Sequence, residues 1–260
     1  MRVGRWIAGP ALLAILAALA IGQNRGVAPA PPPRAGAPFD PTGYWVSQIV
    51  DEWRFRVTPQ KGDILYLPLN AAARRAANAW DPAKDEAGGN ACKAYGAVGV
   101  MQRPGRLRIT WENDTTLRID TDAGTQTRLL HFGPAPAQAV APTLQGYSSA
   151  AWHYSARAML DLGGVGFVAG GGPQGRSGTL RVVTTGLLPG YLRKNGVPYG
   201  AGARLTEAFD RLTGAQNDAY LIDTAVLEDS EYLTQPFVRT YTFKKQSDGS
   251  GWDPTPCWPR

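Results

Sequence analysis

Apolar and polar residues alternate with a period of two over much of the chain, and this pattern predicts β-strands. In the string RLRITWE, which begins at Arg106, every second residue from Leu107 to Trp111 is apolar, and the residues between them are Arg or Thr. Such alternation places one set of side chains in a core and the other in water. The strings TTLRID and TQTRLLHF follow after the turn-forming sequences ND and DAG. We therefore expect a three-stranded meander over residues 106–132.

Similar segments recur on both sides of this meander. They are expected to form strands at Tyr44 to Val50, Arg54 to Val57, Ile64 to Leu67, Val98 to Arg103, Thr179 to Leu187, Arg204 to Leu212, Ala219 to Leu227 and Phe237 to Lys245. No internal repeat of about 20 to 50 residues is visible, which disfavours a propeller or a solenoid. The prediction is an all-β fold, an antiparallel barrel of about ten strands with one short helix.

The short helix is predicted where the alternation stops. Asn70 is a favourable N-cap for the string AAARRAANAW, and Asp81-Pro82 would end the helix. Its apolar side is formed at helical spacing by Leu69, Ala72, Ala73, Ala76 and Trp80. We expect this helix to pack over one barrel opening or one face of the sheet.

The N-terminus has the pattern of a secretory signal. Arg2 and Arg5 precede an uncharged apolar run from Ile7 to Gly22, 16 residues long, which ends in small residues. A retained membrane anchor is the alternative, but a spanning helix needs about 20 residues. We expect a signal peptide over 1–22, a disordered Pro- and Ala-rich tether over 23–38, and a single β-barrel domain over 39–260. The expected location is periplasmic or secreted, with no membrane span after cleavage.

Charge and cysteine content narrow the partners. Loss of Arg2 and Arg5 with the signal lowers the formal net charge from +6 to about +4, and the remaining basic residues are scattered, so no nucleic-acid partner is expected. Cys92 and Cys257 are the two cysteines of the chain. An isolated pair in an exported protein favours a disulfide. It would tie the tail from Trp252 to Trp258 onto the body.

Familiar catalytic and cofactor motifs are weak or absent in the sequence. The two histidines, His131 and His153, have no metal-ligand spacing around them, so no metal site is predicted. The string GGVGFVAGGG within Gly163–Gly178 lacks the strand and helix context of a dinucleotide-binding loop, and a loop between two strands is expected instead. Gly146-Tyr147-Ser148-Ser149-Ala150 is not a serine nucleophile elbow. No cofactor is predicted.

Two segments do indicate a ligand site. GYW at 43–45 opens the first strand as in lipocalin-type barrels, where the Trp closes one barrel end and a cation from the last strand stacks on it; Arg239 or Lys244 is expected in that role. YLRKNGVPY at 191–199 places two tyrosines and two cations around an Asn-Gly turn. This loop is either the mouth of a site for an anionic or aromatic ligand, or a hairpin whose cations stand in water.

Several strings together carry a resemblance to a known family. These are GYWVSQIVDEWRFR, AWDPAKDEAGGNACKAYG, LRIDTDAGTQTR, GYLRKNGVPY, LTEAFDR and LTQPFVRTYTFKK, which between them span most of 39–257. The chain resembles a family of exported bacterial proteins with lipocalin-like barrels. That resemblance implies the fold and no particular activity. Arg108 stands where a histidine is expected in similar chains, and the glycine-rich loop is longer than usual.

The favoured function is therefore binding of a small, partly apolar molecule. The expected ligand-binding residues are Tyr44, Trp45, Tyr95, Arg108, His131, Tyr191, Arg193 and Tyr199. One alternative is an enzyme, an isomerase or hydrolase that acts on a small molecule in the barrel with His131 or Glu207 as general base. The other is an envelope interaction module whose barrel has no open cavity.

Overall fold

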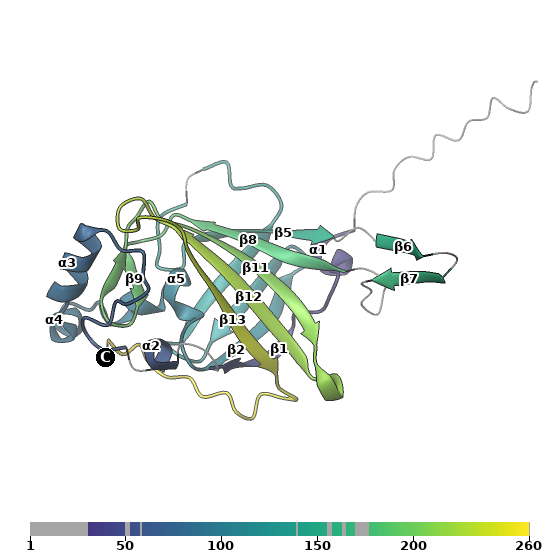
Figure 1. Cartoon of the computed structure of the whole chain (residues 1–260), viewed down its shortest axis with the longest axis horizontal. Coiled ribbons are helices and arrows are strands. Elements are labelled where there is room, and N and C mark those ends of the chain that lie inside the picture. Colours follow the sequence, from purple (N-terminus) through teal and green to yellow (C-terminus); the bar gives the residue numbers. More distant parts are fainter. Residues whose placement is uncertain are drawn as a thin grey trace, which may run out of the picture. The chain divides into compact units, whose positions relative to one another are not determined.

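A closed barrel of nine strands forms the body of the protein (Figure 1). The computed structural model describes residues 31–49, 53–57, 59–138, 140–154, 158–162, 165–169 and 177–259. Around the barrel the strand order is β1-β13-β12-β11-β8-β5-β4-β3-β2, and β2 pairs with β1 to close it. The barrel strands are β1 Gly43–Gln48, β2 Arg106–Asn113, β3 Thr116–Thr121, β4 Gln126–Phe132, β5 Tyr147–Tyr154, β8 Gly178–Thr185, β11 Arg204–Thr213, β12 Ala219–Glu228 and β13 Phe237–Lys245.

The expected all-β barrel is confirmed, but with nine strands and not ten, and with one parallel pair. β4 and β5 run parallel, with Leu130 opposite Ser148, whereas the other neighbouring pairs of the barrel are antiparallel. A parallel pair needs a connection long enough to return the chain to the starting end of the sheet. The segment from Gly133 to Gly146 supplies that connection, which breaks the hairpin order of a purely antiparallel barrel.

In the described part of the chain, four further strands form two small sheets. β9 Gly190–Arg193 pairs with β10 Val197–Tyr199, and β6 Ala158–Leu162 pairs with β7 Val165–Ala169. β7 therefore occupies a part of the glycine-rich segment that was expected to be a loop. Most of the rest of that segment lies outside the described residues.

The helices are short and more numerous than the sequence predicts. They are α1 Pro33–Gly36, α2 Trp53–Val57, α3 Ala71–Ala79, α4 Pro82–Ala87 and α5 Ala97–Val100, with 3₁₀ turns η1 Ala91–Tyr95 and η2 Ala215–Asn217. The α3 prediction is confirmed, since the Asn70 side chain accepts a hydrogen bond from the Ala73 amide as an N-cap. Asp81-Pro82 ends this helix and also begins α4, because the Asp81 side chain accepts from the Ala83 amide.

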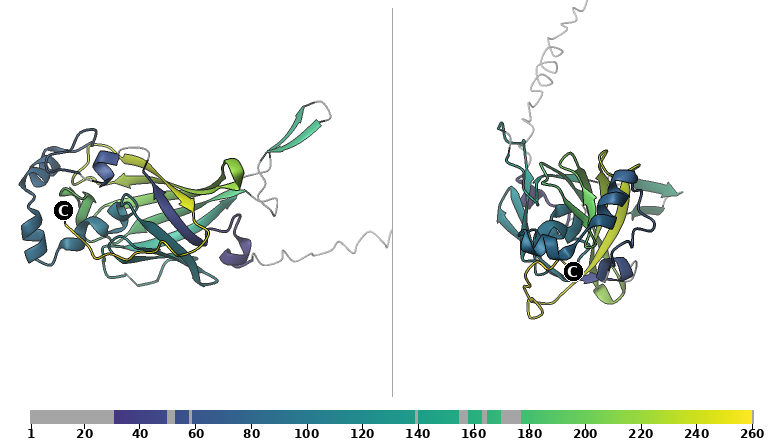
Figure 2. Two further views of the ribbon diagram at one scale, coloured as in Figure 1. Left: turned by 90° about the horizontal axis from the view of Figure 1, so that it is seen from below. Right: turned by 90° about the vertical axis from the view of Figure 1, so that its left-hand side faces the viewer.

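Three expected strands are wrong. Residues 54–57 lie in α2, residues 64–67 form no strand, and residues 98–103 begin in α5 and continue as turns. All three segments gather at one end of the barrel, which we call the helical end, together with α3, α4, η1 and the β9–β10 hairpin (Figures 1 and 2). There they pack on other loops and helices, so that tertiary contacts override strand propensity.

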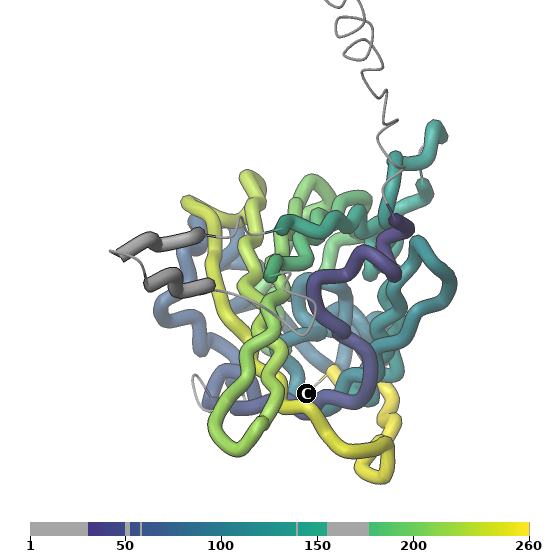
Figure 3. Tube along the Cα trace, turned by 90° about the vertical axis from the view of Figure 1, so that its right-hand side faces the viewer, coloured from purple at the N-terminus to yellow at the C-terminus, as the bar shows by residue number. Residues whose placement is uncertain are grey.

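At the opposite end of the barrel lies α1 (Figure 3), beside an aromatic cluster. Phe39, Trp111, Phe132 and Trp152 contact one another with ring centroids 5.2–5.6 Å apart. The Trp152 indole donates to the Pro33 carbonyl, which holds α1 in place. Pro33–Gly36, which forms α1, lies within the expected tether over 23–38. The predicted signal peptide over 1–22 lies outside the described residues.

Within the described part of the chain, no helix is long and apolar enough to span a bilayer.

Candidate functional site

A buried ion pair crosses the inside of the barrel. Arg128 on β4 donates two hydrogen bonds to Glu207 on β11, at 2.8 and 2.6 Å, and both side chains are fully buried. Arg128 also donates to Thr184, whose hydroxyl lies 2.7 Å from that of Ser148. A bidentate arrangement of this kind offsets the cost of burying both charges.

Asp223 on β12 lies close to this pair and raises its electrostatic cost. Neither oxygen of its fully buried carboxylate has a hydrogen-bond partner among the described residues. Burial, and then the negative charge of Glu207, raise the pKa of Asp223 well above its usual value, while Arg128 opposes the shift. Asp223 is therefore a carboxyl group that favours the neutral form.

One void among the described residues of the barrel interior is too small for a ligand. A space of about 10 Å³ is lined by Val98, Leu192, Leu205, Ala225, Leu227, Phe237, Arg239 and Tyr241. That volume is at most enough for a single water molecule. Two larger cavities lie at the ends of the barrel.

A cavity of about 430 Å³ lies at the helical end. It is lined by Arg56, Val57, Tyr95, Arg103, Pro104, Ala123, Lys194, Thr255, Pro256 and Trp258. These residues come from α2, η1, the turn after α5, the β3–β4 and β9–β10 turns and the C-terminal tail. The volume is in the range of small-molecule sites. We call this space the cationic cavity, because three of the described lining residues are basic and none is acidic.

Arg103 is the most unusual residue of the cationic cavity. Its side chain is 4% exposed, and its Nε donates to the Gly99 carbonyl at 3.3 Å. The two terminal nitrogens, Nη1 and Nη2, have no hydrogen-bond partner among the described residues. Burial lowers the pKa of Arg103 to about 10. A buried cation whose donors are unused costs free energy, so this position is a candidate for binding an anion.

The cavity contains two further cations, Arg56 and Lys194. Arg56 donates to the carbonyls of Gln48 and Gln102, which anchors α2 to the barrel. Lys194 lies at the β9–β10 turn, where desolvation, and then the charge of Arg103, lower its pKa to about 8. Each of these positive charges raises the cost of the others, and a bound anion would relieve that cost.

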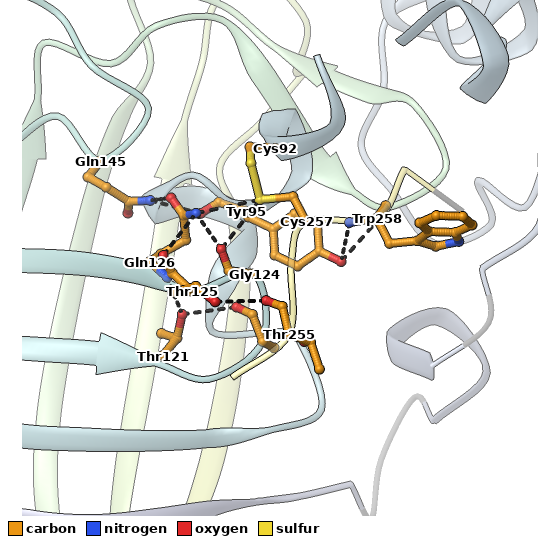
Figure 4. Close-up of a disulfide and its surroundings, with 11 residues drawn as sticks. Cys92, Tyr95, Thr121, Gly124, Thr125, Gln126, Gln145, Thr255, Cys257 and Trp258 are labelled. Carbon is orange, nitrogen blue, oxygen red and sulfur yellow. Dashed lines mark hydrogen bonds between the residues drawn. A yellow bond between two sulfur atoms is a disulfide. The ribbon is translucent and has the colours of Figure 1, made fainter. Parts of the chain in front are cut away.

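One wall of the cationic cavity is the C-terminal tail, which the predicted disulfide between Cys92 and Cys257 joins to η1 (Figure 4). The Tyr95 hydroxyl donates to the Trp258 carbonyl and accepts from the Trp258 amide. Thr125 donates to the Thr255 carbonyl, which ties the tail to the β3–β4 turn. At Gly124, with φ +78°, a Cβ would collide with the Tyr95 ring, so the turn approaches this wall closely.

The predicted ligand-binding residues do not form one site. Tyr95 lines the cationic cavity, and Arg193 lies next to Lys194 with its guanidinium 4.3 Å from the Phe55 ring centroid. Tyr191 donates to Asp85 and Tyr199 is buried against the helices, so both pack the helical end. Of the remaining four side chains, Tyr44, Arg108 and His131 lie on the outer surface of the barrel, and Trp45 is buried and donates to the Pro41 carbonyl.

Several details of these predictions are corrected. The cation over Trp45 is Lys245, 5.2 Å from the ring centroid, and not Arg239 or Lys244. Arg108 pairs with Asp120 at 3.0 Å and lies over Trp252, away from the cationic cavity. In the 191–199 loop, which does form a hairpin, Arg193 is buried and Lys194 half-buried, so these cations do not simply stand in water.

The two proposed general bases do not share a site. His131 stacks on Tyr147, with ring centroids 4.9 Å apart, on the outside of the barrel, and burial lowers its pKa. Glu207 is held inside by Arg128. His153 is exposed. Within the described ranges, no group of three or more His, Cys, Asp or Glu residues is arranged to hold a metal ion.

A second cavity of about 410 Å³ lies at the α1 end. Its lining includes Arg34 and Arg211, together with Asp40 and Trp111. Unlike the cationic cavity, it contains an acidic side chain, and the half-exposed Arg34 already has Asp114 within 3.9 Å. A bound anion would therefore stabilise these cations less than those of the cationic cavity. This makes the α1-end cavity a suitable internal control.

Arg56 and Arg103 were not among the predicted site residues, and Lys194 was predicted only as one of the two cations of the 191–199 loop. Their types gave little signal, because scattered cations are ordinary on a protein surface. For Lys194, the signal in the sequence was its position directly before the Asn-Gly turn of that loop. Comparison of the chain with protein-family models, with curated proteins and with solved structures finds no match in any of the three. The resemblance to exported lipocalin-like proteins thus stays a prediction.

Proposed function

We propose that this protein is an exported, lipocalin-like binding protein for a small, partly apolar anion, which occupies the cationic cavity. The observation that carries the proposal is Arg103, a buried cation with two nitrogens that lack partners, in a cavity with no acidic residue among the described lining. A ligand oxyanion would supply the missing acceptors. The disulfide is consistent with an oxidising compartment, and so with export.

The apolar part of the proposed ligand is suggested by the rest of the lining. Tyr95, Val57, Pro104 and Trp258 give the cavity aromatic and aliphatic surface beside its cations. Aromatic rings bury apolar ligand area and also tolerate a nearby cation. A molecule with a carboxylate, phosphate or sulfonate on an aryl or short alkyl body fits this combination better than a sugar or a free metal ion.

The test is a binding measurement on matched variants. Isothermal titration with an aryl sulfonate, 8-anilinonaphthalene-1-sulfonate, and with phenyl phosphate should show binding to the wild-type chain, and benzyl alcohol should bind much more weakly. Arg103→Met should weaken binding of both anions at least about tenfold, as expected for a charge-assisted contact. Arg211→Met, which removes a cation from the α1-end cavity, is the matched control and should bind like wild type.

Two results would contradict the proposal. One is the absence of any anion binding to the folded wild-type chain. The other is equal weakening by Arg103→Met and Arg211→Met, which would indicate a nonspecific response to net charge.

A further inference from the structure

Five exposed apolar side chains belong to segments that contact the cationic cavity or its neighbouring turns. Trp53 and Tyr66 are 63% and 81% exposed, and Leu65, Val57 and Trp258 are exposed as well. Val57 and Trp258 line the cavity directly. Isolated exposed apolar residues are common on proteins, but a group of large ones around a charged cavity marks an interaction surface.

Local contacts bring the other three residues to the same place. Arg54, the neighbour of Trp53 on α2, pairs with Asp63 at 3.0 Å. Asn195, next to Lys194 of the cavity, donates to the carbonyls of Gln60 and Asp63. The loop that carries Leu65 and Tyr66 is thus tied to α2 and to the β9–β10 turn. We call Trp53, Val57, Leu65, Tyr66 and Trp258 the apolar rim.

The backbone conformation of Tyr66 supports a binding role for the apolar rim. Its φ is +62°, in the left-handed region that a bulky side chain rarely adopts. This conformation costs free energy, and yet the side chain that it presents gains no burial in return. Strain of this kind, when it is retained, accompanies binding surfaces and other functional positions.

We propose that the cationic cavity and its apolar rim together bind the surface of a membrane that contains anionic phospholipid. This inference rests on the proposed function and names the source of the anion, a lipid phosphate. Trp and Tyr side chains favour the boundary between headgroups and acyl chains. Val57 and Trp258 of the rim line the same cavity as Arg103 and Lys194, so a headgroup phosphate would enter the cavity as the rim enters the interface.

Charge complementarity favours this occupant over a protein partner. The cations of the cavity favour a concentrated negative charge. The side chains of the apolar rim favour an apolar layer directly around that charge. An anionic bilayer offers both at once, with phosphates above hydrocarbon. Binding should therefore need anionic lipid and also depend on the rim.

The experiment is sedimentation of the full chain with vesicles of phosphatidylcholine alone or with about one third phosphatidylglycerol, at physiological salt. Every variant keeps the same N-terminal segment, so any membrane affinity of that segment cancels in the comparison. Partition should favour the anionic vesicles. Trp53→Ser/Tyr66→Ser should reduce this partition by about tenfold or more, from the lost burial of two aromatic side chains.

Leu65→Ser and Leu212→Ser form the matched pair, because both leucines are exposed to a similar extent, 59% and 53%. Leu212 lies at the end of β11 near η2, away from the rim. Leu65→Ser should weaken partition several-fold and Leu212→Ser should leave it unchanged. Equal effects of the two variants, or equal binding to both kinds of vesicle, would overturn the inference.

Titration with soluble phenyl phosphate separates this inference from the proposed function. If phenyl phosphate binds in an Arg103-dependent manner while anionic vesicles do not bind, the membrane proposal is wrong and the small-molecule function stands. If neither anion is bound, the proposed function itself has failed. A rim variant that no longer binds anionic vesicles but still binds phenyl phosphate would support both the membrane proposal and the proposed function.

Discussion

Two buried arginines of this protein have opposite environments. Arg128, inside the barrel, gives both terminal nitrogens to Glu207, whereas the terminal nitrogens of Arg103 have no partner among the described residues. Burial opposes the charge of both. The nearby carboxylate nevertheless keeps the pKa of Arg128 raised, and Arg103, without one, has a lowered pKa. We infer that Arg128 serves the stability of the barrel and Arg103 serves a ligand.

The largest expected effect comes from breaking the satisfied pair. Glu207→Leu leaves Arg128 buried without its carboxylate, and this should lower the free energy of unfolding by about 3–5 kcal/mol. Urea denaturation at pH 7 measures the change.

The double variant Arg128→Met/Glu207→Leu is the control for that measurement. It removes both charges, so its stability should return to within about 1 kcal/mol of wild type or exceed it. If the single variant costs less than about 1 kcal/mol, or if the double variant is as unstable as the single, the pair does not hold the barrel as described.

A smaller effect is expected at Asp223. Because burial raises the pKa of its carboxyl group above the unfolded value, its favourable contribution to stability is present below the unfolded pKa and is lost as pH rises through the folded pKa. Asp223→Asn should therefore stabilise the protein at pH 7 by on the order of 1 kcal/mol, and give no gain near pH 3. Thermal unfolding across that pH range measures the difference.

Glu228→Gln is the companion variant for Asp223→Asn. Glu228 is an exposed carboxylate that pairs with Arg204 at 3.5 Å. Its replacement should change stability by less than about 1 kcal/mol at any pH. A gain at Glu228 as large as that at Asp223 would show that net charge, and not burial, is responsible.

Arg103→Met should have little effect on folding, in contrast to Glu207→Leu. The variant loses one hydrogen bond to Gly99 but also removes the cost of a buried charge. The net change in unfolding free energy should stay within about 1 kcal/mol by the same urea assay. A loss of about 3 kcal/mol or more would place Arg103 with Arg128 among structural residues.

The two arginines also differ in how well the sequence predicts their surroundings. The strands that contain Arg128 and Glu207 were predicted within a few residues, because their alternation is local information. The surroundings of Arg103 were not, since they depend on α2, the turn after α5, the β9–β10 turn and the tail, which are far apart in the chain. The Val98–Arg103 segment was even expected to be a strand. The disulfide was predictable because the chain has one cysteine pair.

The smallest expected effect is a pH dependence of ligand affinity at Lys194. Desolvation and Arg103 lower the pKa of this lysine to about 8, and a bound anion favours its protonated form. The affinity for an aryl sulfonate, whose own charge is constant, should therefore fall a few-fold as pH rises from about 7 to 9. Lys194→Met should bind more weakly at pH 7 and lose this slope.

Arg103→Met should move the midpoint upward, because the removed charge no longer lowers the Lys194 pKa. A slope that persists in Lys194→Met would mean that another group titrates. An unmoved midpoint in Arg103→Met would mean that the two cations do not share one cavity.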